Sequence, residues 1–200
     1  MPKQFYIIIG KSGSGKGTQA PLLKAYLEST GHQSVKHITT GGAMREFVAT
    51  DQSLTRDLVF NKMERGELMP PFFAIWNWTN ILIKNLNKSD TIILEGAPRE
   101  LSEAKMFDAA LKFYDYDDIN IIYLDVSDRW AIQRLIARGR SDDSGQSKVE
   151  QKMEWFAKDV LNVIDWYKHI NTQVKFLHIN GEQSPEQVFA DIKKSIKMYA

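Results

Sequence analysis

Residues 10–19, with the sequence GKSGSGKGTQ, constrain the fold more than any other part of the chain. They follow an apolar run at residues 5–9 and precede a segment whose leucines recur at helical spacing. Strand, glycine-rich loop and helix are the context of a phosphate-binding loop, in which backbone N–H groups surround an anion at the positive end of the helix dipole. A hairpin or linker would need no lysine at this place. The sequence therefore predicts a phosphate-binding loop.

Side chains of this loop have distinct expected roles. Lys16 would neutralise the outer phosphates, and the hydroxyl group of Thr18 would contact a phosphate or the water shell of Mg²⁺. The usual loop carries Ser or Thr directly after the lysine, whereas Gly17 intervenes here. The residues expected to bind the donor phosphates are Gly13, Ser14, Gly15, Lys16, Gly17 and Thr18.

Composition narrows the class of protein. Two hundred residues, 43% of them hydrophobic, suit one domain with a sizeable core. Twenty-six basic residues against 25 acidic ones indicate no overall field for nucleic acid or an anionic membrane. The absence of cysteine excludes disulfides and thiolate metal sites, and no run of about 18 apolar residues occurs. We expect a cytoplasmic monomer whose partners are small molecules.

Apolar runs alternate with helical segments along the chain. Continuous apolar runs between turn residues are typical of strands buried on both faces of a parallel sheet. The sequence therefore predicts a five-stranded parallel sheet with helices on both faces and ligands at the carboxyl ends of its strands. The expected strands are residues 5–9, 35–38, 91–94, 119–126 and 174–179. The expected helices are residues 20–26, 53–65, 72–86, 102–113, 128–138 and 149–167, one from 43 and one from 184.

Three local features refine this scheme. The turn at residues 39–42 predicts a helix start at Ala43, which would place Arg45 just beyond a helix N-terminus. The apolar residues of 72–86 predict a largely buried helix. The polar loop at 139–148 is expected to be mobile.

Five motifs follow one another in a recognisable order. They are residues 10–19, Thr40-Gly41 with Arg45, residues 66–68, residues 95–99, and the arginines and aspartates between 134 and 143. This arrangement resembles the adenylate kinase family of nucleoside monophosphate kinases over nearly the whole chain. In that family a Gly-Thr pair after the loop lysine is normal, so the position of Gly17 supports the resemblance.

The resemblance implies a three-layer P-loop NTPase fold in a single domain spanning residues 1–200. The core would comprise residues 1–38, 89–138 and 149–200, with a nucleoside monophosphate-binding helical insert at about 39–88 and a short lid at about 139–148. The short-lid form lacks the zinc-bearing insert of some relatives, in agreement with the absence of cysteine. The implied reaction is reversible, Mg²⁺-dependent phosphoryl transfer from ATP to AMP, giving two ADP.

The resemblance also assigns roles to residues. Phosphoryl transfer brings several phosphates together and needs positioning and charge neutralisation, which suits arginine. The implied catalytic residues are Lys16, Arg45, Arg99, Arg134, Arg138 and Arg140, of which Arg134 also binds ATP. The implied acceptor site comprises Thr40, Gly41, Arg45, Met69, Gly96, Arg99 and Glu103. Thr18 and Glu95 would hold Mg²⁺ through water, and the bond before Pro98 would be cis.

The identity of the acceptor base stays open at this point. The family usually has Gln where this chain has Glu103. An amide donates and accepts, whereas a carboxylate only accepts, so GMP is an alternative to AMP. UMP or CMP are further alternatives. Otherwise Glu103 simply faces water in the first turn of its helix, where an acid is favoured.

Two rival functions remain. A small-metabolite kinase on the same core would not explain the acceptor-side motifs at Arg45 and Arg99. A nucleotide-binding regulatory protein with weakened catalysis is suggested by Glu103, by Ala97 in place of an aromatic residue, and by Lys152 in place of a further arginine. The four histidines lack the spacing of metal ligands, and the five tryptophans are expected to pack, with Trp76 and Trp78 bordering the acceptor pocket.

Overall fold

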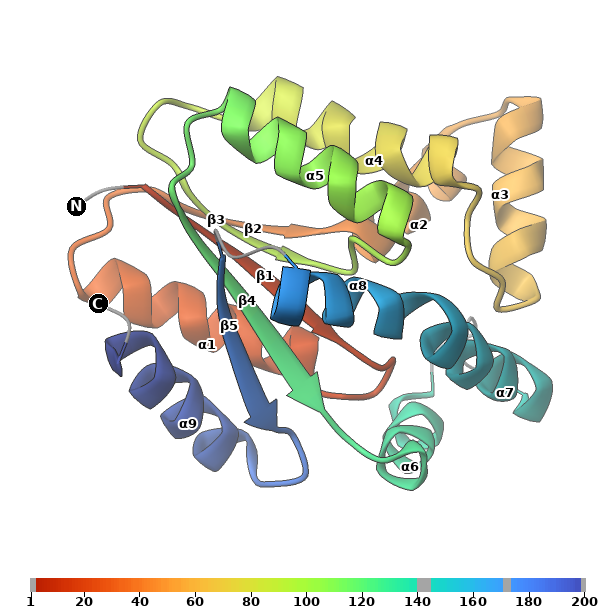
Figure 1. Ribbon diagram of the computed structural model, residues 1–200. Helices are drawn as coiled ribbons and strands as arrows, with labels where there is room; N and C mark the ends of the chain where they lie inside the picture. Colours follow the sequence, from red (N-terminus) through yellow and green to blue (C-terminus); the bar gives the residue numbers. More distant parts are fainter. Residues whose placement is uncertain (1–2, 140–144, 171–173, 199–200) are drawn as a thin grey trace.

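The computed structural model describes residues 3–139, 145–170 and 174–198. Within these, five parallel strands form one sheet in the order β2-β3-β1-β4-β5 (Figure 1). The strands are β1 (Gln4–Gly10), β2 (Val35–Thr39), β3 (Thr91–Glu95), β4 (Asp118–Asp125) and β5 (Val174–Asn180). All five predicted strands are confirmed, because central parallel strands are apolar along their whole length.

Helices fill the connections between the strands. Their bounds are α1 (Lys16–Ser29), α2 (Thr40–Thr50), α3 (Leu54–Glu64), α4 (Pro71–Asn85), α5 (Leu101–Phe113), α6 (Asp128–Arg138), α7 (Gln146–Trp155), α8 (Leu161–Asp165) and α9 (Pro185–Met198). Two π-helical turns, Phe156–Val160 and Trp166–Ile170, flank α8. The predicted helix at 149–167 is therefore one long segment that widens twice. None of the helices described is both long and apolar enough to cross a membrane.

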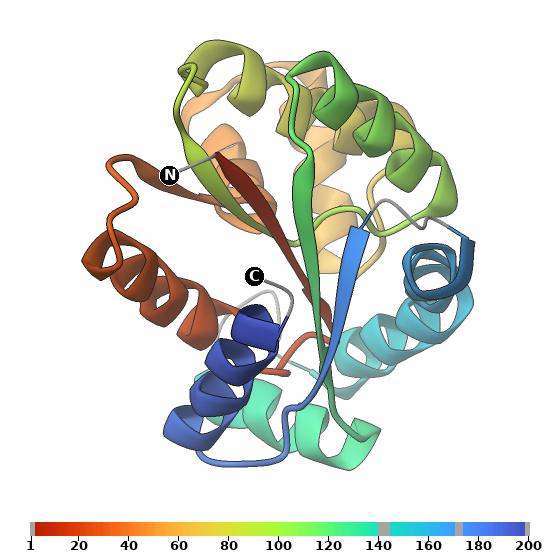
Figure 2. The ribbon, with the colours of Figure 1, turned by 60° about the vertical axis from the view of Figure 1, so that its left-hand side comes forward.

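Alternating side chains of the strands enter two separate cores. On β1, Tyr6 and Ile8 pack with α1 and α9, whereas Phe5, Ile7 and Ile9 pack with α4, α5 and the segment from α7 to α8. Figure 2 shows the helices on the two sides of the sheet. This is the predicted three-layer α/β architecture, and it brings the carboxyl ends of the strands to one edge.

Two smaller apolar clusters lie beside that edge. One joins α2, α3 and α4 through side chains that include Met44, Val59 and Phe73. The other joins α6 to α7 through Leu135 and Val149, among others. These clusters support a helical insert and a lid base, whose proposed bounds stay predictions.

Two local predictions were wrong. Helix α2 begins at Thr40 rather than Ala43, since the Thr39 hydroxyl accepts a hydrogen bond from the Gly42 N–H and caps the helix earlier. Arg45 consequently lies in the second turn of α2. Helix α4 is amphipathic rather than largely buried, because Phe72 and Ile83, each 72% exposed, face away from its packed side. The Ala97–Pro98 peptide bond is cis, as expected.

Candidate active site

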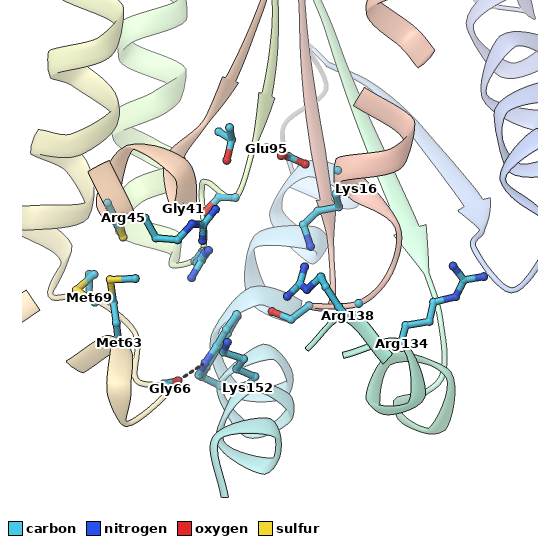
Figure 3. Close-up of a pocket in the computed structure, with 18 of the residues that line it drawn as sticks. Lys16, Gly41, Arg45, Met63, Gly66, Met69, Glu95, Arg134, Arg138 and Lys152 are labelled. Carbon is cyan, nitrogen blue, oxygen red and sulfur yellow. Dashed lines mark hydrogen bonds between the residues drawn. The ribbon is translucent and has the colours of Figure 1, made fainter. Parts of the chain in front are cut away.

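A cleft of about 510 Å³ lies at the carboxyl ends of β1 and β3 (Figure 3). It contains predicted residues from four separate parts of the chain: the glycine loop, α2, the end of β3 with the loop that follows it, and α6. Predicted residues that line it are Gly13, Gly15, Lys16, Gly17, Thr18, Gly41, Arg45, Met69, Glu95, Gly96, Arg99, Arg134 and Arg138. Folding therefore brings the donor-side and acceptor-side motifs to one cavity.

The glycine loop is held by close backbone contacts. Gly13 and Gly15 have φ angles of 88° and 96°, which L residues with side chains rarely adopt. A Cβ atom on Gly13 would lie 2.4 Å from the carbonyl oxygen of Ala131 in α6, so glycine is required for the approach as well as for the turn. Ser14 is not part of the cleft wall, because its side chain is buried behind the loop.

Lys16 opens α1 and points into the cleft (Figure 3). Its Nζ donates hydrogen bonds to the carbonyl oxygens of Gly10 (2.7 Å) and Lys11 (2.8 Å). Burial lowers the pKa of Lys16 to about 7, partly opposed by the carboxylate of Glu95 and reinforced by the nearby cations of Arg99, Arg138 and Lys152. A cleft that disfavours its own lysine cation is one that would be stabilised by bound anions.

Two arginines lie on the acceptor side. The Arg45 guanidinium lies over Gly41, where an added Cβ would be 3.5 Å from its Nη1. Arg99 donates from Nε to the Gly96 carbonyl oxygen (2.7 Å), and its guanidinium stacks 5.2 Å from the ring centre of Trp155. These contacts orient two planar forks toward one volume, the geometry that suits bidentate binding of a phosphate.

Gly96 and Thr40 bring the acceptor-side backbone together. At Gly96, with φ of 90°, an added Cβ would lie 2.6 Å from the Thr40 Oγ1. The Thr40 hydroxyl donates to the Glu95 carbonyl oxygen at 3.4 Å, and the Asn77 side chain donates to the Thr40 carbonyl oxygen at 3.0 Å. The buried Thr40 therefore joins α2 to the end of β3.

The lid-side arginines come from α6. Arg138 lies in the last turn of α6, and Arg134 lies one turn earlier with its guanidinium 4.6 Å from the ring centre of Trp130. Both line the cleft and have exposed side chains. Arg140, the third predicted lid arginine, falls outside the described residues.

Glu95 provides a carboxylate beside the glycine loop. A Cβ atom on Gly17 would lie 3.9 Å from both Glu95 carboxylate oxygens, and the Thr18 side chain lines the same cleft. His37 on β2 approaches Glu95, with Nε2 3.5 Å from Oε1. One carboxylate and one hydroxyl beside phosphates fit Mg²⁺, which keeps several waters and takes substrate oxygens. Among the described residues, no cluster of three or more His, Cys, Asp or Glu could itself cage a metal.

Glu103 does not face water. It lies in the first turn of α5 and is 3% exposed, and its Oε2 accepts a hydrogen bond from the Arg99 backbone N–H at 2.9 Å. Burial raises its pKa to about 7, against the lowering effect of the Arg99 hydrogen bond and charge. The alternative of a solvated charge was therefore wrong.

Trp155 belongs to the site, although its sequence context predicted only packing. It lines the cleft, and its Nε1 donates to the Gly66 carbonyl oxygen at 3.1 Å, linking α7 to the loop after α3. The signal was its position three residues after Lys152, on the same side of α7, since Lys152 also lines the cleft. By contrast, Trp78 is fully buried against Phe107, and neither it nor Trp76 lines the cleft.

Comparisons with known proteins agree with this geometry. A sequence model of the family described as "Adenylate kinase" matches residues 8–172. The chain is 30% identical to the adenylate kinase of Prochlorococcus marinus subsp. pastoris over 195 residues, covering 97% of this chain and 98% of the relative. It is 28% identical to adenylate kinase 1 of Nostoc sp. over 193 residues, covering 95% and 97%, and 28% identical to the adenylate kinase of Nautilia profundicola over 196 residues, covering 98% and 97%.

Proposed function

The chain belongs to the adenylate kinase family, and we propose that it catalyses reversible phosphoryl transfer from ATP to AMP, giving two ADP. The observation that carries this proposal is the convergence of cationic side chains from four elements on one cleft. Lys16 lies beside the glycine loop, Arg45 and Arg99 lie opposite it, and α6 supplies two more arginines. A single anion would not require cations on both sides.

The chemistry follows from this arrangement. An oxygen of the AMP phosphate attacks the γ-phosphorus of ATP, the bond between that phosphorus and the β–γ bridging oxygen breaks, and the γ-phosphoryl group moves without an enzyme-bound intermediate. Arg45 and Arg99 hold the acceptor phosphate in line, and Lys16 holds the donor phosphates. Arg134 and Arg138 neutralise charge on the transferring group.

Thr18 and Glu95 are the residues that would hold Mg²⁺, through its water shell. When bound, the ion supplies further neutralisation of the clustered phosphates. We propose that the helical insert at about 39–88 and the lid at about 139–148 close over the nucleotides. Closure would expel water and prevent hydrolysis of ATP. We also propose that the protein works as a cytoplasmic monomer.

The test is direct. The protein is incubated with Mg-ATP and each nucleoside monophosphate separately, and diphosphate formation is followed by chromatography. ADP formation that requires AMP is the expected result. Tight ATP binding with no diphosphate from any acceptor would instead identify a nucleotide-binding regulatory protein.

ATP binding is expected to take up a proton at about pH 8. Because the pKa of Lys16 is about 7 in the free cleft, the amine is mostly neutral there at pH 8, and bound phosphates would restore its charge. Close to one proton should be taken up at about pH 8 and far less at about pH 6, so affinity should weaken as the pH rises above 7. Titration calorimetry in buffers of different ionisation enthalpy measures the uptake. Identical binding enthalpies in all buffers at pH 8 would contradict the prediction.

A further inference from the structure

A recess opens from the acceptor side of the cleft. Met69, Gly96 and Arg99 border both, so a nucleotide whose phosphate lies between Arg45 and Arg99 can extend into the recess. Its walls are mostly apolar, from Met44, Leu68 and Ala74 among others. Apolar side chains beside a single polar group are what a flat aromatic base requires, since the walls contact its faces and the polar group contacts its edge.

The polar group at the inner wall is the carboxyl group of Glu103. Its Oε2 is held by the Arg99 backbone N–H at 2.9 Å, and among the described residues the structure records no other hydrogen bond for this carboxyl group. One oxygen is thus oriented by the protein. The rest of the hydrogen-bonding capacity of the group remains for a ligand.

The two protonation states of a carboxyl group recognise different purines. A neutral carboxyl donates through one oxygen and accepts through the other, which matches the N1 acceptor and N6 amino donor of adenine. A carboxylate only accepts, which matches the N1–H and N2 amino donors of guanine but opposes the adenine N1 lone pair. A mismatched buried polar group is costly, so each state rejects the other base.

We propose that Glu103 selects the acceptor base according to its own protonation, binding AMP when neutral and GMP when ionised. This inference rests on the proposed function, because it assigns the recess to the acceptor nucleotide. It explains how a chain of this family accommodates a carboxyl group at the wall of the acceptor pocket. It also turns base preference into a property that changes with pH.

The surroundings of Glu103 support a change near neutral pH. Burial favours the neutral carboxyl and raises the pKa of Glu103 to about 7. The charged groups that face it are Arg99, which opposes this shift, and Glu100, which reinforces it. Tyr167 lies behind it, with a phenol pKa raised well above the usual value by burial and by Asp108. The recess walls from α2, α4 and the loop before α4 contribute no further titratable side chain.

Equilibrium binding tests the proposal without requiring turnover. Dissociation constants for AMP and for GMP are measured by calorimetry between about pH 6 and pH 8. We expect the preference for AMP over GMP to fall by at least about tenfold across this range, since Glu103 ionises within it. Using the ratio cancels contributions that the two ligands share, including ionisation of their phosphates. A constant ratio would overturn the proposal.

Two variants sharpen the result. Glu103→Gln keeps the acceptor for the Arg99 N–H and fixes one donor, so it should prefer AMP at every pH. Glu186→Gln, an exposed glutamate in the first turn of α9, is the matched control and should retain the pH dependence of the wild type. A pH-dependent ratio that persists in Glu103→Gln would assign the effect to another group and overturn the proposal.

The two proposals fail in distinguishable ways. If no diphosphate forms from any acceptor but the binding preference still changes with pH, the proposed function fails and the base selection stands. If ADP forms from AMP but the preference is constant, the base selection alone fails.

Discussion

Arg99→Ala is expected to lower kcat for ADP formation by roughly 10²–10³-fold, the usual cost of removing one donor aimed at developing charge. The guanidinium is held toward the acceptor phosphate by the Gly96 carbonyl oxygen and the face of Trp155. Stability should change by only about 1 kcal/mol, because one hydrogen bond and one cation–π contact are lost from a partly exposed side chain. Steady-state kinetics and thermal unfolding measure the two effects.

Two further variants of this arginine series make the test specific. Arg99→Lys should fall between wild type and Arg99→Ala, because lysine keeps the charge but cannot form a bidentate fork. Arg129→Ala, on the exposed side of α6 and outside the cleft wall, should keep wild-type kcat. A near-normal kcat in Arg99→Ala would remove Arg99 from the proposed site.

Gly13→Ala should destabilise the fold and weaken ATP binding together. The new Cβ would lie 2.4 Å from the Ala131 carbonyl oxygen while the backbone has a φ of 88°, so the loop or α6 must move. We expect the free energy of unfolding to fall by about 3 kcal/mol, from overpacking added to left-handed strain. Denaturant unfolding and calorimetric titration with ATP give the two measurements.

Gly15→Ala is the matched comparison for this loop. Gly15 has a similar φ of 96°, but no neighbouring atom lies within 4 Å of an added Cβ. Its loss of stability should therefore be limited to backbone strain, about 1 kcal/mol. Equal destabilisation by the two alanines would show that the Ala131 contact contributes nothing.

Much of the fold could be predicted because the relevant forces act locally. The strand residues 91–94 are apolar without interruption, as burial on both faces of a sheet requires, and they form most of β3. Helix α6 was predicted at its observed bounds, since Ser127 caps its start and Gly139 in the left-handed conformation ends it. The start of α2 was misplaced because glycine is neither a clear stop nor a clear start, and the Thr39 cap was decisive.

The candidate site was only partly predictable. The glycine loop carries its own signature, and the acceptor-side arginines were found through family resemblance. Trp155 was missed because its two partners, Arg99 and Gly66, are distant in sequence and meet it only when α7 packs beside the cleft. Arg140 remains a prediction from the sequence.

The sequence by itself determined the layered α/β fold, the phosphate-binding loop and the kind of chemistry, because periodicity and glycine spacing depend on residues that are near one another in the chain. Tertiary structure decided the state of Glu103. The sequence shows a carboxyl group near a helix start, a place that usually favours its ionised form. Packing of α2, α4 and α5 around it removes water and favours the neutral form, because desolvation costs a charge more than the helix terminus returns.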